Sequence, residues 1–224
     1  MKIVFGYPSW TGETPLFGWF ARRNSTWPCL SLAVIAAACE AAGHEAQIID
    51  AEALQITCNE LARRIIAAKP DIVGFSAYTP FAHLSADVAT AIKKLEPDLP
   101  IIIGGPHVTI MKEKALLDCY DYAFVGEAER SLPEFLNWHS SGHLGHGQVK
   151  GMIYRDWRGE IINTGDAWLR DTAMRKEELG GRYPLDEIPL PARHLLPMER
   201  YRLGTRDGRR YFTSLQTARG CPWR

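Results

Sequence analysis

Short apolar runs alternate with stretches of helical periodicity along the first 140 residues of the chain. Each run is followed, directly or after a loop, by a segment whose apolar residues recur every three or four positions. The pattern predicts five strands, at residues 2–5, 45–50, 71–76, 100–103 and 122–125. It also predicts five helices, at residues 29–42, 60–69, 82–95, 108–118 and 130–139.

This alternation of strands and helices predicts a parallel sheet that is covered by helices on both faces. The third and fourth strands are almost continuously apolar, which is typical of strands buried on both sides. We therefore expect an α/β domain of the flavodoxin-like (Rossmann-like) class with a doubly wound, five-stranded parallel sheet. Ligands of such sheets lie outside the carboxyl ends of the strands, so the loops after the first, third, fourth and fifth strands are the candidate site.

Beyond residue 140 the pattern changes. Two alternating segments, 149–154 and 160–164, are joined by a polar turn and predict a β-hairpin. Prolines then exclude a long helix between residues 185 and 197. We expect three parts. Residues 1–140 form an α/β domain, and residues 141–184 form a linker and the hairpin. Residues 185–224 form a proline-rich linker that leads to a short strand near 213–217.

Composition and charge narrow the function classes. The chain has 224 residues, 46% of them hydrophobic, which is ample for a core. Its formal net charge is zero and no basic block stands out, so nothing favours a nucleic-acid footprint. No apolar stretch is long enough to span a membrane. Five scattered cysteines are typical of a protein in the reducing cytoplasm.

Residues Gly104, Gly105, Pro106 and His107 follow the fourth strand and precede a predicted helix. Two glycines remove side chains where a backbone must approach a ligand, and a helix N-terminus offers free N–H groups. The segment is neither a P-loop nor a GxGxxG dinucleotide turn. An ordinary βα turn that needs a positive φ explains the same residues equally well.

Several segments resemble the cobalamin-binding domains of B12-dependent radical S-adenosylmethionine (SAM) enzymes. Residues 103–109 are similar to the GGPHAT-like segment of that family, and residues 124–129 to its VxGEGE segment, with Ala128 in place of a glycine. Residues 71–76 are similar to its third strand. The segments at 27–50, 151–154 and 185–193 also match in the family's order.

The last seven residues, 218–224, resemble the beginning of the CxxxCxxC loop that holds the [4Fe–4S] cluster in that family. Cys221 would be the first cluster ligand, and the other two cysteines would follow Arg224. The resemblance thus implies that the chain is the N-terminal portion of a longer protein whose radical SAM barrel is missing here.

The resemblance implies that cobalamin is bound by the loops at the carboxyl ends of the strands. The residues that we expect to contact it are Pro8, Ser9, Trp10, Ser76, Ala77, Tyr78, Thr79, Gly104, Gly105, Pro106, His107, Val108, Gly126, Glu127 and Glu129. Glu127 and Glu129 would bond a ribose or the corrin amides, although capping of a helix N-terminus explains Glu129 at least as well. Gly105 is expected to be the most sensitive position, because a β-carbon there would push the ligand from the backbone.

The first loop departs from the DxHxxG pattern of other cobalamin modules. Residues 7–12 contain neither the Asp nor the cobalt-ligating His of that pattern. The resemblance therefore implies cobalamin bound base-off, without that imidazole, with Trp10, Tyr78 or another loop group packed beneath the corrin. The benzimidazole tail is expected near residues 104–106, and a histidine elsewhere in the chain remains an alternative cobalt ligand.

Taken together, the resemblance implies a cobalamin-binding portion of a radical SAM enzyme that also uses a [4Fe–4S] cluster and SAM. A methyltransferase acting on an unactivated carbon is the expected parent; this portion alone would bind cobalamin and catalyse nothing. Two other hypotheses remain: a stand-alone flavodoxin-like module that binds flavin or a nucleotide or serves in signalling, and half of a nucleotide-sugar transferase. The first loop lacks the Ser/Thr-rich phosphate cradle of flavodoxins, and the sequence does not identify the substrate.

Overall fold

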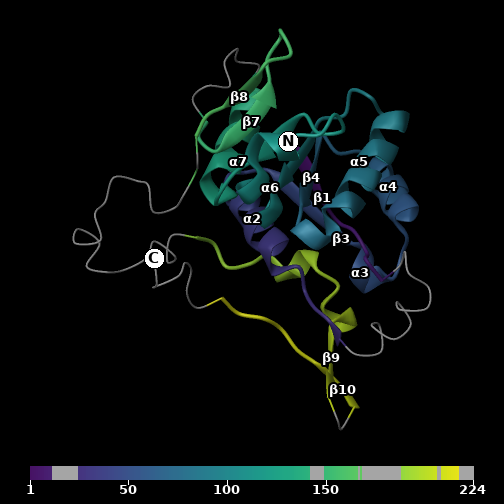
Figure 1. The fold of residues 1–224 in the computed structure, drawn as a ribbon. Coiled ribbons are helices and arrows are strands. Elements are labelled where there is room, and N and C mark those ends of the chain that lie inside the picture. Colours follow the sequence, from purple (N-terminus) through teal and green to yellow (C-terminus); the bar gives the residue numbers. More distant parts are fainter. Residues whose placement is uncertain (12–24, 142–148, 166, 168–187, 206–207, 217–224) are drawn as a thin grey trace, which may run out of the picture.

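The computed structural model describes residues 1–11, 25–141, 149–165, 167, 188–205 and 208–216, and the statements below concern these residues (Figure 1). A central sheet of seven strands runs in the order β3-β1-β4-β5-β6-β7-β8. Its strands are β1 (Lys2–Tyr7), β3 (Glu45–Asp50), β4 (Ile72–Ser76), β5 (Ile101–Gly104), β6 (Tyr122–Phe124), β7 (Met152–Arg155) and β8 (Ile161–Asn163). The first five are parallel, which confirms the predicted doubly wound sheet of the flavodoxin-like class.

Helices cover both faces of this sheet (Figure 1). They are α2 (Leu30–Ala41), α3 (Ala51–Leu54), α4 (Cys58–Ala67), α5 (Ala82–Leu95), α6 (Pro106–Met111) and α7 (Ala128–Ser140). Helices α2 and α7 pack together on one face, and α4 and α5 pack together on the other. Because successive side chains of a strand point to opposite faces, the sheet separates the core into these two layers.

The sequence of α2 explains why this helix is deeply buried. Apolar residues surround it on nearly every side, and seven of its residues are buried. A helix that is apolar all round belongs in the interior rather than at a surface. By contrast, α4 has one apolar face and begins at the cap residue Thr57, whose hydroxyl accepts the N–H of Glu60 at 3.3 Å.

The predicted hairpin is confirmed, and it continues the main sheet rather than standing apart from it. Strand β7 pairs antiparallel with β6, with Ala123 opposite Ile153, and β8 pairs with β7. The hairpin therefore covers the edge that β6 would otherwise expose. Met152 and Ile153 have no exposed surface, so β7 belongs to the core of the α/β domain.

Two predicted elements are wrong. The helix expected over 108–118 ends at Met111, where Lys112 takes a φ of +49°, and a 3₁₀ turn (Lys112–Ala115) follows. This break lets Ala115 and Leu116 turn into the core. The strand expected over 213–217 is the second. Residues 213–216 are not in a strand, because no described strand pairs with them, and Thr217 lies outside the described residues.

A second, smaller sheet precedes that segment and was not predicted. Its strands are β2 (Ser25–Thr26), β9 (Arg202–Thr205) and β10 (Gly208–Tyr211), all antiparallel. It joins a segment near the start of the chain to one near its end. Two 3₁₀ turns, Arg193–Leu195 and Met198–Arg200, lead into β9.

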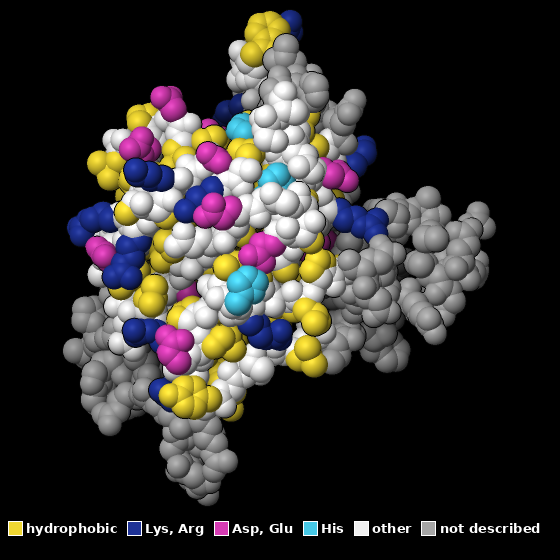
Figure 2. All heavy atoms as spheres, turned by 180° about the vertical axis from the view of Figure 1, so that it is seen from behind, with side chains coloured by type: hydrophobic (Ala, Val, Ile, Leu, Met, Phe, Trp, Pro, Cys, Tyr) yellow, Lys and Arg dark blue, Asp and Glu magenta, His cyan; other side chains and the backbone are white. Residues whose placement is uncertain are grey.

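Charged side chains are mixed on the surface. Figure 2 shows acidic and basic groups interspersed on the face opposite to that of Figure 1, with no large area of one sign. Within the described ranges, no helix is both long enough and apolar enough to cross a membrane.

We predict that truncating Met152 will destabilise the whole α/β domain, because β7 lies in its core. Met152→Ala should lower the free energy of unfolding by about 2–5 kcal/mol, as is usual for large-to-small changes at fully buried sites. Ile161→Ala on the partly exposed strand β8 is the matched control and should cost less than about 1 kcal/mol. Urea unfolding measures both; a loss below 1 kcal/mol for Met152→Ala would show that the hairpin is not part of this core.

Candidate functional site

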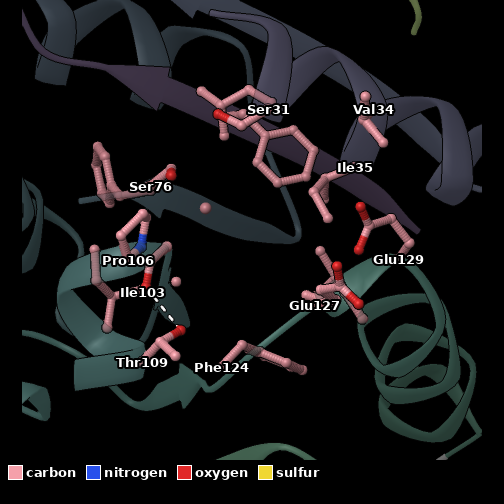
Figure 3. A pocket seen from close by; sticks show the side chains of 18 of the residues that line it. Ser31, Val34, Ile35, Ser76, Ile103, Pro106, Thr109, Phe124, Glu127 and Glu129 are labelled. Carbon is pink, nitrogen blue, oxygen red and sulfur yellow. Dashed lines mark hydrogen bonds between the residues drawn. The ribbon is translucent and has the colours of Figure 1, made fainter. Parts of the chain in front are cut away.

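A pocket of about 950 Å³ lies at the carboxyl edge of the sheet, between α2 on one side and α6 and the start of α7 on the other (Figure 3). Its floor is the sheet itself, through Phe5, Ile102 and Phe124. Figure 3 shows Val34 and Ile35 of α2 facing this floor. The volume falls within the range of small-molecule sites, and the walls are mainly apolar, as is usual for such sites.

The pocket exists because the ends of β4 and β5 carry small residues on the face that α2 covers. Gly74, Ser76 and Gly104 alternate on that face. A β-carbon on Gly74 would meet the ring of Phe5 at 2.6 Å, so this glycine gives room to a neighbouring side chain. A β-carbon on Gly104 would find its nearest atom, Cβ of Phe124, only at 3.8 Å. Gly104 therefore leaves space that other parts of the protein do not use.

Gly105 has a different role. Its φ is +96°, and a β-carbon there would lie 2.7 Å from Oγ of Ser76 and 2.9 Å from the carbonyl oxygen of Ala77. Backbone bonds join the same two loops: Ala77 N–H donates to Gly104, and His107 N–H donates to Ala77. Gly105 is thus required by the turn itself, as the ordinary βα-turn interpretation holds. This clash within the protein is a second reason, besides the expected displacement of a ligand, for Gly105 to be sensitive to substitution.

The same bonds use N–H groups that were expected to be free at the start of α6. Pro106 has no N–H group, and the N–H of His107 is donated to the carbonyl oxygen of Ala77 at 3.1 Å. The remaining polar group of the motif is the side chain of His107, whose Nδ1 lies 3.2 Å from Oγ1 of Thr79. This contact ties the loop after β5 to the loop after β4.

The charges of the pocket are carboxylates. Among the described residues that line it, Glu127 and Glu129 are charged and none is basic. Both lie at the end of the pocket where α7 begins (Figure 3). The described lining thus offers carboxylate acceptors and no basic side chain that could pair with a phosphate group. Neutral rings and groups with hydroxyl or N–H donors are favoured.

The loop after β1 is fixed from below by Glu52 of α3. Ser9 Oγ donates to Glu52 Oε2 at 2.7 Å, and Thr11 Oγ1 donates to Glu52 Oε1 at 2.6 Å, all in the interior. Between them Trp10 is presented at the surface, where its ring stacks on Phe81 with centroids 5.6 Å apart. Trp10 is 39% exposed and Phe81 42% exposed, so the pair offers an open aromatic face at the carboxyl edge.

The structure brings about half of the predicted site residues to the pocket. Those that line it are Ser76, Tyr78, Gly104, Gly105, Pro106, Gly126, Glu127 and Glu129. Those at the carboxyl edge that do not line it are Pro8, Ser9, Trp10, Ala77, Thr79, His107 and Val108. Ala77 and Val108 are buried in the layer of α4 and α5. Cys221 lies outside the described residues.

Sequence reasoning missed one wall of the pocket and part of its mouth. Helix α2 supplies Leu30, Ser31, Val34 and Ile35. The sequence did contain a signal for this wall. Apolar residues occur on nearly every side of α2, which indicates that the helix contacts something apolar on more than one face. Leu215 and Gln216 also line the pocket, although they follow the domain by about 75 residues, and no sequence signal pointed to them.

A buried polar network underlies the N-terminus of α2. Asp50, at the end of β3, accepts the hydroxyl of Tyr201 at 2.7 Å and the N–H of Ala53 at 2.9 Å, and the thiol of Cys29 also bonds to it. Burial raises the pKa of the Asp50 carboxyl and that of the Cys29 thiol. Tyr201 has no exposed surface. The network therefore anchors the later part of the chain to the wall of the pocket.

Fold and site together define an α/β domain with an apolar, acidic-ended ligand pocket at a topological switch point. Residues 19–136, more than half of the chain, match the family model of the B12 binding domain. The chain belongs to the B12-binding domain family. Within the described residues, no group of three His, Cys, Asp or Glu side chains could hold a metal ion.

Relatives of this chain are longer proteins. It is 31% identical over 202 residues to an uncharacterized methyltransferase of Pyrococcus horikoshii, covering 89% of this chain and 40% of the relative. It is 27% identical over 173 residues to the anaerobic magnesium-protoporphyrin IX monomethyl ester cyclase of Cereibacter sphaeroides, covering 75% of this chain and 27% of the relative. The chain thus spans well under half of each.

A solved structure shares the fold. The cobalamin-dependent S-adenosylmethionine radical enzyme OxsB, with aqua-cobalamin and S-adenosylmethionine bound, superposes with a TM-score of 0.64. The match covers 85% of this chain and 24% of that one, at 17% sequence identity. The likeness therefore concerns the arrangement of helices and strands.

We predict that the two adjacent glycines will respond differently to a single methyl group. Gly105→Ala should lower the free energy of unfolding by about 1–3 kcal/mol, because its positive φ and the close Ser76 and Ala77 atoms both oppose a β-carbon. Gly104→Ala should change it by less than about 1 kcal/mol, because its β-carbon would meet Phe124 only at an ordinary contact distance of 3.8 Å. Urea denaturation distinguishes the two, and equal losses would contradict these separate roles.

Proposed function

We propose that this chain binds cobalamin and forms the N-terminal portion of a B12-dependent radical SAM enzyme, a methyltransferase that acts on an unactivated carbon. Membership of the B12-binding domain family supports the cofactor. The relatives named as a methyltransferase and a cyclase support an enzyme as the parent. Because the chain spans 40% and 27% of those relatives, the reaction belongs to the larger protein and not to this portion.

One observation carries the proposal: the pocket at the carboxyl edge suits the nucleotide tail of cobalamin. Its apolar floor suits a neutral benzimidazole ring, and the space over Gly104 is large enough for ring atoms to approach the strand. Glu127 and Glu129 accept hydrogen bonds from ribose hydroxyls or corrin amides. The phosphate of the tail lies outside the pocket, because the described lining has no basic side chain to balance it.

With the tail in the pocket, the corrin lies over the carboxyl edge of the sheet. The stacked Trp10 and Phe81, with Tyr78 three residues before Phe81, form an aromatic surface there. Residues 7–12 contain no histidine, so this loop would supply no imidazole to cobalt, and a benzimidazole tail held in the pocket would leave the cofactor base-off. When bound, cobalamin supplies a cobalt ion that carries a methyl group; the chain's own residues bind and orient it.

The alternative ligands fit this pocket less well. Flavin mononucleotide and nucleotide sugars carry phosphates, which need N–H donors or cations. The described lining has two carboxylates and no basic residue, and the turn before α6 offers no free N–H from Pro106 or His107. The mixed surface charge in Figure 2 likewise gives no support for a nucleic-acid partner.

The expected parts of the chain follow from the same proposal. Residues 1–140, with the hairpin strands β7 and β8 that extend their sheet, form the cobalamin-binding domain; the rest of 141–184 is a linker, and 185–224 is the connection to a radical SAM barrel. Cys221 is the first ligand of a [4Fe–4S] cluster that, with SAM, belongs to the whole protein. We place the protein in the reducing cytoplasm, and Cys29, Cys39, Cys58 and Cys119 form no disulfides.

Chain length places that cluster near the pocket. Gln216 lines the pocket, and Cys221 follows it by five residues. A fully extended chain advances at most about 3.6 Å per residue, so the two Cα atoms lie within about 18 Å of each other. A cluster bound through Cys221 would therefore lie within reach of the pocket.

We predict that the 224-residue chain retains hydroxocobalamin in equilibrium dialysis. Gly104→Val should weaken binding by about tenfold or more, because its side chain fills space that the tail would occupy. Ala67→Val, at an exposed position of helix α4, introduces the same valine side chain away from the site and should leave the affinity unchanged. A well-folded wild type that retains no cobalamin, or equal retention by Gly104→Val, would count against the proposal.

We predict that the parent gene encodes two more cysteines, at the fourth and seventh positions after Cys221. The motivation is the Arg219-Gly220-Cys221-Pro222 segment, together with relatives that are more than twice as long as this chain. Each iron of a cluster needs its own thiolate or substrate ligand, so three cysteines are the minimum for this loop. Reading the gene decides it: other residues at both positions would exclude the radical SAM assignment.

A further inference from the structure

The end of the described chain returns to the ligand pocket. Residues 188–205 and 208–216 form an extended arm that runs past α2, turns at β9 and β10, and then runs back (Figure 1). Its last two described residues, Leu215 and Gln216, line the pocket. The mouth of the pocket is therefore built from two parts of the chain, the α/β domain and the arm.

The outgoing half of the arm is firmly attached to the domain. Ala192 N–H donates to the carbonyl oxygen of Ala33 in α2 at 2.9 Å. Tyr201 is fully buried and donates to Asp50 at 2.7 Å. Ala192, Leu196 and Tyr201 all pack in the apolar layer beneath α2. This half is thus a fixed support and shares its core with one wall of the pocket.

The returning half of the arm is attached to the outgoing half through Arg193. The Nε of Arg193 donates to Oγ1 of Thr213 at 3.2 Å, and its Nη2 donates to the carbonyl oxygen of Ser214 at 2.7 Å. These bonds end one residue before Leu215, which is 70% exposed. A planar guanidinium that makes two such bonds fixes direction as well as distance.

We propose that Arg193 is a positioning residue that completes the ligand pocket by holding the returning end of the arm, Leu215 and Gln216, at its mouth. This inference rests on the proposed function, because the ligand is cobalamin. Arg193 does not line the pocket and acts through Thr213 and Ser214. It also gives a role to Arg193, the last residue of the family-like segment 185–193, which the proposed function alone leaves without one.

One consequence concerns the residues that follow the arm. If the ligand contacts Leu215 and Gln216, binding favours the docked arm, and the docked arm favours binding by the same factor. Cys221 lies five residues beyond Gln216. Occupation of the pocket therefore biases where the cluster loop begins, and Arg193 couples the two.

The first test needs no ligand. Backbone ¹⁵N relaxation of the 224-residue chain should give order parameters near 0.8 for residues 213–216, and Arg193→Gln should lower them below about 0.6. Arg200→Gln is the matched control on the same arm. Arg200 is exposed, and its Nε lies 3.7 Å from Oε1 of the adjacent residue Glu199, so this ion pair does not join the two halves of the arm. Arg200→Gln should change nothing. Unchanged order parameters in Arg193→Gln would overturn the proposal.

The second test measures the pocket. Arg193→Gln should raise the dissociation constant of hydroxocobalamin about fivefold or more, with an unchanged melting temperature, while Arg200→Gln binds as the wild type does. Tyr201→Phe, which loosens the root of the arm and keeps Arg193, should weaken binding in the same direction. A mobile arm end with unchanged affinity would show that the arm does not complete the pocket, and would overturn the proposal.

The two tests separate this inference from the function on which it rests. A wild type that binds no hydroxocobalamin contradicts the proposed function, and the relaxation data still decide whether Arg193 holds the arm. A wild type that binds, with affinity insensitive to Arg193→Gln, upholds the proposed function and contradicts the inference.

Discussion

The pocket depends on a steric constraint at the ends of two neighbouring strands. On the face that α2 covers, β4 and β5 end in Gly74, Ser76 and Gly104, where most buried parallel strands carry large apolar side chains. Phe5 fills the room beside Gly74, and the room over Gly104 stays open. A larger residue at either strand end would fill the space between the sheet and α2, because protein interiors are normally close-packed. The open space over Gly104 is therefore the central part of the pocket.

The rest of the molecule holds the walls of that gap in place. Glu52 fixes the loop after β1 through Ser9 and Thr11, and Asp50 fixes the arm through Tyr201. Both carboxylates are buried, so each needs the hydrogen bonds that it receives, and removing the partner groups would leave a costly charge or acceptor unsatisfied. The polar interior thus serves to position loops and the arm, while the pocket itself stays apolar apart from its acidic end.

Much of this could be predicted from the sequence, for identifiable reasons. The length of the apolar runs and the helical periodicity between them predicted the five parallel strands, and the motif around Gly104 predicted that the site lies at the carboxyl edge of the sheet. The break in α6 was not predictable from periodicity, because it depends on Ala115 and Leu116 finding the core. The roles of Gly104 and Gly105 could not be separated either, since only the positions of Ser76, Ala77 and Phe124 distinguish them. The approach of Leu215 to the pocket is a tertiary contact between distant segments and left no local signal.

The central claim is that the nucleotide tail of cobalamin enters the pocket over Gly104. Nuclear Overhauser effects between the benzimidazole methyl protons of bound, diamagnetic hydroxocobalamin and the protein side chains test it most directly. The account predicts contacts to Phe5, Ile102 and Phe124 on the floor and to Val34 or Ile35 of α2. Methyl contacts confined to residues outside this pocket, or a benzimidazole still coordinated to cobalt, would contradict it.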